Sequence, residues 1–304
     1  MALVEIKHLK KYYNTPRGLL HAIDDVTMDI EKGKTIGIVG ESGCGKSTLG
    51  KTLIRMEDAT DGEVYFDGKE VTHMSQHEFK NMRMRMQMIF QDPYASLDPR
   101  MSVSQLIAEP IQTYHLAKNK KELDEMVFQL MEEVGLAKRL ANSYPHELDG
   151  GRRQRIGIAR ALFEDPEVLV LDEATSGLDP IMRDEMLDVF LEFVQEENHS
   201  ILLSSHITSD LEKVADYITF IHNGKLITTV SKNDLVYNYA VMRCKESQFL
   251  TLDPKDILAY RKRDFQIDVL VSNGKEAQKK YKGVVVDHVS VDEIMLLLVK
   301  GERV

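Results

Sequence analysis

The stretch Thr35-Ile-Gly-Ile-Val39, followed by Gly40-Glu-Ser-Gly-Cys-Gly-Lys46-Ser47, decides the fold of this chain. Its first five residues are a short, mostly apolar run that predicts a buried strand. The next eight fit the pattern G-x-x-x-x-G-K-[ST], whose glycines let backbone N–H groups wrap a phosphate. A helix that begins after such a loop points its positive end at the same phosphates. The order of strand, loop and helix therefore predicts a phosphate-binding loop.

Two side chains of this loop have predicted chemical roles. Lys46 can reach the β- and γ-phosphates of a nucleotide, and Ser47 can ligate Mg²⁺. Cys44 lies near the helix N-terminus and near Lys46, two features that lower the pKa of a thiol. We weigh a reactive thiol there equally against an inert small residue. The candidate nucleotide-binding residues of the segment are Gly40, Ser42, Gly43, Cys44, Gly45, Lys46, Ser47 and Thr48.

A second apolar strand, Val168 to Leu171, runs directly into two acids, Asp172 and Glu173. At the carboxyl end of a strand, Asp172 would hold the coordination shell of Mg²⁺. Glu173, one residue further on, could polarise an attacking water. The alternative is that the acids only cap the strand. Because a phosphate-binding loop is present, the catalytic interpretation is favoured.

The segments around the loop change from strand patterns to helix patterns. Leu3 to Ile6 and Val26 to Ile30 alternate roughly with polar residues, and Asp67-Gly68 predicts a hairpin turn. From about Ser102 to Phe163 the spacing becomes helical, and an amphipathic helix is clearest from Leu123 to Val134. These patterns predict an antiparallel β subdomain and an α-helical subdomain at about residues 91–163.

Alternation of strands and helices returns in the second half of the chain. Val168 to Leu171, Ile201 to Leu203 and Tyr217 to Ile221 are strand-like, and a helix around Met186 to Val194 separates the first two. This order predicts a parallel sheet with crossover helices. Residues 217–230 should form a terminal hairpin. The fold class expected for residues 1–230 is therefore α/β, with a P-loop NTPase core.

The pattern changes again after about Ser231. Two strand-like stretches, Ile267 to Val271 and Gly283 to Val286, precede a segment with helical spacing, Asp292 to Val299. We expect residues 231–304 to form a small α+β accessory domain. A chain of 304 residues is also long enough for about two domains.

Composition narrows the classes of function. The net charge of −10 argues against nucleic acid as the main partner, because neutralising phosphates needs a basic surface. Two cysteines cannot make a disulfide framework, which favours a reducing compartment. No run approaches 18 apolar residues, so we expect a chain that does not span a membrane.

The motif Leu148-Asp-Gly-Gly-Arg-Arg-Gln154 begins a predicted helix and makes a family resemblance explicit. Over about residues 3–230 the chain resembles the ATP-binding subunit of an ABC transporter. The resemblance implies ATP and Mg²⁺ as ligands. It also implies that the signature residues Asp149, Gly150 and Gly151 contact ATP held on a second subunit.

The same resemblance assigns roles to residues that would otherwise pass as structural. Tyr13 is the aromatic residue expected to stack on adenine. Gln91 is the Q-loop glutamine, with a part in catalysis and in binding Mg²⁺ beside Ser47 and Asp172. His206 is the switch histidine and joins Glu173 in catalysis. Ser176-Gly-Leu-Asp179 corresponds to the D-loop.

The signature departs from the usual Leu-Ser-Gly-Gly-Gln at two positions, Asp149 and Arg152. Aspartate caps a helix as well as serine does, so the local structure should survive. Its charge, however, would lie near the triphosphate across a dimer. Two unit charges about 4 Å apart cost ~4 kcal/mol at an effective dielectric constant of ~20, before screening. This puts in doubt the ATP site that this signature completes.

Resemblance to subfamilies differs between the two halves of the chain. Phe90 to Arg100 and Tyr144-Pro-His-Glu147 resemble peptide and nickel importers. Thr175 to Glu185, Ser204 to Asp216 and the closing Val299-Lys-Gly-Glu302 resemble ATPases of antibiotic and multidrug exporters. A natural and a chimeric sequence remain alternatives.

The resemblance implies an ATP hydrolase that dimerises on ATP, with itself or with a different ATPase, and drives transmembrane permease subunits. Such a subunit would lie at the cytoplasmic face of the membrane.

Peptide uptake is the leading expectation, because the helical subdomain that contacts the permease is the importer-like part. Drug export is the alternative. A non-transport ABC ATPase fits less well, because the chain has one cassette and no long coiled coil between Lys46 and Asp149. A pure binding module is a third possibility, if Asp149 abolishes turnover.

Overall fold

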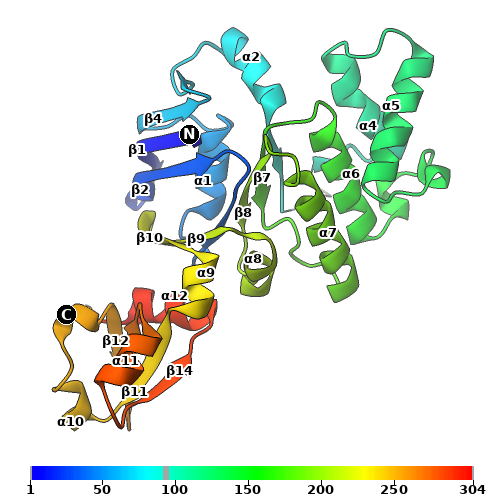
Figure 1. Cartoon of the computed structure of the whole chain (residues 1–304). Helices are drawn as coiled ribbons and strands as arrows, with labels where there is room; N and C mark the ends of the chain where they lie inside the picture. Colours follow the sequence, from blue (N-terminus) through cyan, green and yellow to red (C-terminus); the bar gives the residue numbers. More distant parts are fainter. Residues whose placement is uncertain (1, 92–95, 303–304) are drawn as a thin grey trace.

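A parallel sheet forms the centre of the structure, a computed structural model that describes residues 2–91 and 96–302. Within these residues it has six strands in the order β10-β9-β3-β8-β7-β6, of which β7, β8, β9 and β10 are labelled in Figure 1. Only β10 pairs antiparallel, with β9, as the predicted terminal hairpin. The bounds are β3 (Thr35–Val39), β6 (Met86–Ile89), β7 (Val168–Asp172), β8 (Ser200–Ser204), β9 (Tyr217–His222) and β10 (Lys225–Ser231). Every residue of β3, β7 and β8 is buried, which explains their apolar runs.

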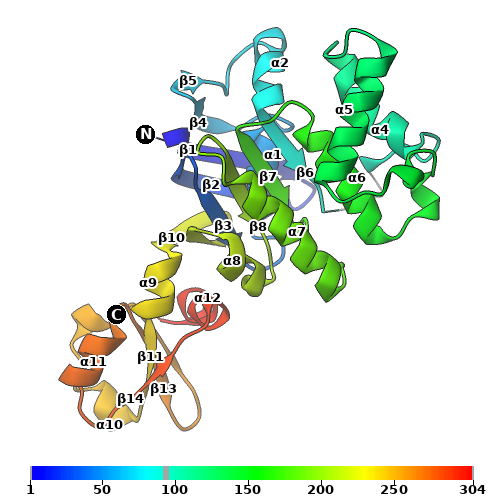
Figure 2. The same cartoon turned by 45° about the vertical axis from the view of Figure 1, so that its right-hand side comes forward.

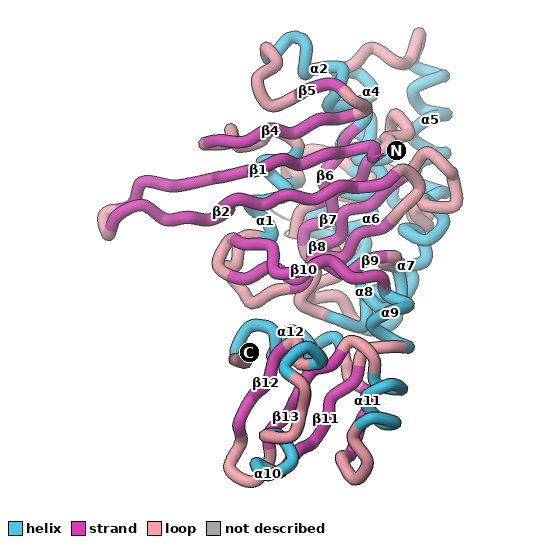
Figure 3. The backbone as a smooth tube through the Cα atoms, turned by 60° about the vertical axis from the view of Figure 1, so that its left-hand side comes forward, coloured by secondary structure: helices cyan, strands magenta, loops and turns pink. Residues whose placement is uncertain are grey.

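An antiparallel sheet covers one side of this centre, as predicted. Its order among the described residues is β2-β1-β4-β5, from β1 (Ala2–Thr15), β2 (Gly18–Glu31), β4 (Asp61–Phe66) and β5 (Lys69–Glu70). Asp67 and Gly68 have φ values of +50° and +73°, the left-handed turn that Asp-Gly favours. Helix α1 (Lys46–Leu53) packs between the two sheets through Leu49 and Leu53. The free end of the β1–β2 hairpin projects beyond β4 (Figure 3).

Helices on the other side form the predicted helical region. They are α4 (Val103–Thr113), α5 (Lys120–Glu133), the short η1 (Lys138–Leu140) and η2 (Pro145–Glu147), and α6 (Gly150–Leu162). Helix α2 (Gln76–Arg85) precedes the predicted range and lies apart from them. Helices α4, α5 and α6 lie side by side (Figure 2). Part of the importer-like stretch, residues 92–95, lies outside the described residues.

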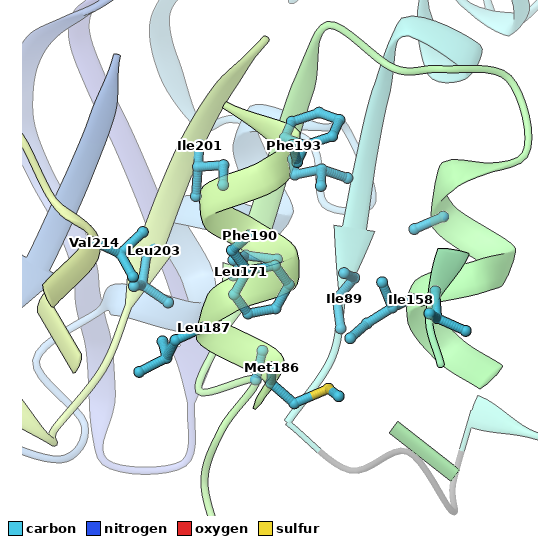
Figure 4. Close-up of a cluster of buried hydrophobic side chains, with 14 of the residues drawn as sticks. Ile89, Ile158, Leu171, Met186, Leu187, Phe190, Phe193, Ile201, Leu203 and Val214 are labelled. Atoms are coloured by element: carbon cyan, nitrogen blue, oxygen red, sulfur yellow. The ribbon is translucent and has the colours of Figure 1, made fainter. Parts of the chain in front are cut away.

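Two further helices pack on the central sheet. Helix α7 (Pro180–Phe193) begins earlier than predicted, at a proline that follows its N-cap Asp179. Its side chains Leu187 and Phe190 lie against Leu171 of β7 and Leu203 of β8 (Figure 4). Full burial of such side chains contributes about 1.5–3 kcal/mol each. Helix α8 (Thr208–Val214) follows β8. Its apolar side chains belong to the same buried core as those of α7, β7 and β8, and the predicted acids lie at the end of β7.

The C-terminal segment builds a third sheet, with order β12-β13-β11-β14 among the described residues. Its elements are α9 (Lys232–Tyr237), β11 (Ala240–Cys244), α10 (Glu246–Phe249), η3 (Pro254–Asp256), β12 (Ala259–Lys262), β13 (Ile267–Val271), α11 (Gly274–Lys280), β14 (Val285–His288) and α12 (Val291–Lys300). The predicted strand at Ile267–Val271 and the closing helix are both present. None of the helices in the described ranges is long and apolar enough to cross a bilayer.

Candidate functional site

The phosphate-binding loop joins β3 to α1 and is pressed against neighbouring backbone. Gly43 and Gly45 have φ values of +79° and +109°, which glycine adopts far more readily than other residues. A Cβ atom on Gly40 would lie 2.3 Å from the Ile221 carbonyl oxygen, and one on Gly45 would lie 2.3 Å from that of Ala22. The glycine spacing of the motif is therefore a steric requirement of this packing.

Lys46 is buried at the start of α1, and its ammonium group is held by the loop itself. Its Nζ donates to the carbonyl oxygen of Gly40 at 2.8 Å and to that of Glu41 at 3.3 Å. The same Nζ lies 3.7 Å from Oε1 of Glu173. A cation in this position is ready to exchange carbonyl oxygens for phosphate oxygens.

Ser47 and Asp172 meet next to Lys46, as the sequence predicted. The Ser47 hydroxyl donates to Oδ1 of Asp172 at 2.8 Å, and Ser204 at the end of β8 donates to the same oxygen at 2.9 Å. A hydroxyl and a carboxylate are hard oxygen ligands that suit Mg²⁺. Mg²⁺ takes one or two protein carboxylates and completes its shell with water and phosphate. The donor set therefore fits Mg²⁺ bound together with a nucleotide.

Glu173 follows β7 in a strained conformation, with φ at +50°. Its backbone N–H donates to the Ser204 carbonyl oxygen at 3.0 Å. Its Oε2 accepts the backbone N–H of His206 at 3.1 Å and also pairs with Nδ1 of the His206 ring. The carboxylate is buried and held from two sides, so its direction is set by the ends of β7 and β8.

Tyr13 lies at the edge of the same site, on β1. Its hydroxyl donates to Oε2 of Glu57, and the ammonium group of Lys11 lies 5.0 Å from the centre of its ring. Burial and the hydrogen bond to Glu57 raise the pKa of Tyr13 to about 12.

One cavity of about 560 Å³ lies at this site, and Asp172 is not among the residues that line it. Most of the predicted loop and catalytic residues line it, together with five residues that sequence reasoning missed. The predicted ones are Tyr13, Ser42, Gly43, Gly45, Lys46, Ser47, Thr48, Gln91, Glu173 and His206. The missed ones are Leu20, His21 and Ala22 of β2, and Asn223 and Gly224 of the β9–β10 turn.

The prediction that the pKa of the Cys44 thiol is lowered is wrong. Lys46 does favour the thiolate, but burial opposes it more strongly, and the net pKa of Cys44 is raised. The side chain is enclosed, and Gly40 leaves room for its sulfur atom. Of the two alternatives, the structure favours the inert small residue.

The signature residues lie apart from this cavity, at the start of α6. Asp149 caps the helix as predicted, with Oδ1 accepting the backbone N–H of Arg152 at 2.8 Å. The Arg152 guanidinium lies 3.3 Å from the other carboxylate oxygen. Asp149, Gly150 and Gly151 do not line the cavity that holds Lys46. Within one chain the signature and the phosphate-binding loop therefore belong to different surfaces.

A second hollow, of about 760 Å³, lies where α2 and β6 face α4 and α6. Apolar side chains, including Met88, Phe90 and Tyr114, line its wall together with three cations, Arg55, Arg83 and Arg160. One acid, Asp58, also belongs to the lining.

Comparisons with known proteins agree with this geometry. A family model described as "ABC transporter" matches residues 23–176. The oligopeptide transport ATP-binding protein OppF of Bacillus subtilis is 48% identical over 237 residues, covering 78% of this chain and 78% of that protein. The dipeptide transport ATP-binding protein DppF of Lactococcus lactis is 38% identical over 264 residues, covering 86% of this chain and 84% of that protein.

Solved structures show the same fold. The dimeric ATP-binding cassette MJ0796, bound to ADP and Pi, superposes with a TM-score of 0.70 at 24% identity. The match covers 75% of this chain and 98% of the cassette. The cbiO1 subunit of the cbiONQ transporter from Clostridium perfringens gives a TM-score of 0.67 at 26% identity, covering 77% of this chain and 90% of cbiO1.

Proposed function

Because the chain belongs to the ABC transporter family, we propose that it is the ATP-hydrolysing subunit of an importer of oligopeptides or dipeptides. The observation that carries the hydrolase assignment is the convergence of Lys46, Ser47 and the Glu173–His206 pair on one cavity, with Asp172 hydrogen-bonded to Ser47. Peptide uptake is supported by the curated relatives, which are oligopeptide and dipeptide transport proteins. Their matches cover 78% to 86% of the chain, more than its importer-like half. The exporter alternative rests on short motifs of the second half.

The chain's own groups account for each step of hydrolysis. The loop N–H groups and the Lys46 ammonium bind the β- and γ-phosphates, with Lys46 leaving its contacts to Gly40 and Glu41. Ser47, Asp172 and Gln91 would hold Mg²⁺, which when bound neutralises the developing charge on the phosphate oxygens. Glu173 orients the attacking water and accepts its proton. His206 holds the Glu173 carboxylate in place.

The remaining predicted residues have supporting roles in this proposal. Tyr13 stacks on adenine, while Gly40, Ser42, Gly43, Cys44, Gly45 and Thr48 shape the loop. Asp149, Gly150 and Gly151 act on ATP held by a second ATPase subunit. Their place outside the cavity of their own chain supports this division of labour.

Partner and domain assignments follow from the surfaces. The larger hollow between α2 and α6 is the proposed docking site for a transmembrane permease, so the subunit works at the cytoplasmic face of the membrane.

We place the ATPase domain at residues 1–230 and an accessory domain at residues 231–304. An apolar core around Met242 and Val269 supports the boundary, and α12 packs across it against the core of the ATPase domain.

Lys46→Ala tests the nucleotide site, because the buried cation is its main source of positive charge. The variant should lose both Mg-ATP binding and phosphate release. Lys51→Ala, on the last turn of the same helix α1, is the matched control and should keep both. Retained nucleotide affinity in Lys46→Ala would count against the site.

The substrate is tested by reconstitution with permease subunits in proteoliposomes. Labelled di- to pentapeptides should enter the compartment that holds the ATPase, and peptide should stimulate ATP hydrolysis. Stimulation by a drug, with movement in the opposite direction, would support export instead.

A further inference from the structure

The C-terminal helix α12 reaches the phosphate-binding loop through one side chain. Nζ of Lys300, the last residue of α12, lies 3.2 Å from Oε1 of Glu41. Glu41 directly follows Gly40, and its carbonyl oxygen accepts a hydrogen bond from Lys46 at 3.3 Å. One loop residue therefore contacts both the cation of the nucleotide site and the C-terminal helix.

The first turn of α12 is fixed to two different parts of the chain. Oδ2 of Asp292 accepts a hydrogen bond from the Thr208 hydroxyl at 3.1 Å. Thr208 begins α8, two residues after His206. The neighbouring Glu293 accepts from the Arg243 guanidinium on β11 at 2.8 Å. The helix start is thus tied to the ATPase core and to the third sheet at once.

The other end of α12 is fixed as well. Directly after the helix, the Glu302 carboxylate accepts the Tyr260 hydroxyl at 2.5 Å, and the backbones of the two residues exchange hydrogen bonds. Between its ends, α12 buries one apolar face, formed by Val291, Ile294 and Leu297, in the same core that holds α8. Lys300 is therefore presented to the loop by a helix that is hydrogen-bonded to its surroundings near both ends.

Glu41 brings a negative charge into a loop that must receive a polyanion, and like charges repel at short range. Its side chain is partly exposed and is not among those lining the nucleotide cavity. The contact with Lys300 draws the carboxylate toward α12 instead.

We propose that Lys300 is a positioning residue for the phosphate-binding loop, which holds the Glu41 carboxylate against α12 and out of the nucleotide cavity. The inference rests on the proposed function, since it assumes that the cavity binds a nucleotide. It gives the accessory segment a part in nucleotide affinity, because displacing α12 would release Glu41.

The test measures the Kd of Mg-ADP for the full chain by isothermal titration calorimetry. Lys300→Met should raise this Kd about two- to fivefold, the effect expected from one exposed ion pair. Lys300→Arg keeps the charge and should restore the wild-type value. Lys275→Met removes the same charge from α11, where the described residues offer no ion-pair partner, and should leave the Kd unchanged.

The decisive arm repeats Lys300→Met in a Glu41→Gln background. With no carboxylate to release, the substitution should lose its effect on the Kd. An unchanged Kd for Lys300→Met alone, or the same increase in both backgrounds, would overturn the positioning role, the latter by showing a general charge effect. If the wild type itself fails to bind Mg-ADP, the proposed function fails together with the inference. If the wild type binds Mg-ADP and Lys300→Met leaves the Kd unchanged, the inference fails and the proposed function stands.

Discussion

Glu173 combines three features at the scale of one residue: burial, a left-handed backbone and two partners at His206. A non-glycine residue in that conformation costs of order 1–3 kcal/mol, and the surrounding packing has to compensate. The Glu173 carboxylate lies 3.7 Å from the Lys46 ammonium group. This position suits the role that we propose for Glu173 as the base for the attacking water.

Glu173→Gln should keep Mg-ATP binding and lower the hydrolysis rate by about 10²- to 10⁴-fold, because the amide cannot accept the proton of the water. The measurement is phosphate release at saturating ATP, with gel filtration to detect a nucleotide-locked dimer. Glu192→Gln, on the exposed side of α7, is the control and should hydrolyse normally. A Glu173→Gln protein with near wild-type turnover would exclude Glu173 as the base.

Cys44 should be slow to react with iodoacetamide in the native protein. Its raised pKa means that less thiolate is present at any given pH, so the alkylation rate should keep rising with pH beyond the ordinary thiol value of 9.0. Cys244, also buried and with a raised pKa, should behave alike.

Mass spectrometry of the alkylated peptides, with and without denaturant, checks this expectation. Both thiols should label rapidly only after unfolding. Rapid native labelling of Cys44 that Mg-ATP prevents would restore the reactive thiol that the sequence alone left open.

At the scale of single elements, α6 depends on its cap. Asp149 satisfies the Arg152 N–H at the start of the helix, and a serine can do the same. Asp149→Ala should therefore lower the free energy of unfolding by about 0.5–2 kcal/mol, while Asp149→Ser should change it little. Urea denaturation followed by circular dichroism measures both. Equal losses in the two variants would show that the charge, not the cap, stabilises the helix.

Buried strands were predictable, whereas some edge strands were not. Strand β13 (Ile267–Val271) is buried throughout, and its predicted and observed bounds agree. Strand β12 (Ala259–Lys262) escaped prediction because it lies at a sheet edge and ends in two basic residues.

The residues of the candidate site also differ in how far the sequence predicts them. The phosphate-binding loop and the acids after β7 follow from local sequence, because the chemistry resides in consecutive residues. Leu20, Ala22 and Gly224 line the cavity through position alone, and no side-chain chemistry marks them in advance. The contact between Tyr13 and Glu57 depends on tertiary packing across 44 positions. Burial, which reverses the expected pKa shift of Cys44, is likewise a property of the folded chain.

At the scale of the whole molecule, the proposed function needs a dimer, because the signature does not line the Lys46 cavity of its own chain. We expect the Lys46–Glu173 site to be closed by the signature of another subunit. The Asp149 signature would then complete that subunit's site. The Asp149–Arg152 pair is largely exposed, with side-chain exposures of 58% and 44%, so solvent and Arg152 both screen the acid.

We predict that the chain works beside a second, different ATPase with an ordinary signature. Purified alone, it should be slow and mostly monomeric, because each site of a homodimer would carry the acid. Adding the partner should raise turnover much more than Asp149→Ser does. The substitution removes one screened charge, and its benefit should stay well below the ~4 kcal/mol limit for an unscreened pair.

The measurement is the ATPase rate of wild type and Asp149→Ser, each alone and with candidate partner subunits. A large gain from Asp149→Ser in the isolated protein would instead indicate a homodimer held back by its own signature. No response in any combination would mean that Arg152 already neutralises the acid, and the site that it completes would then be a competent one.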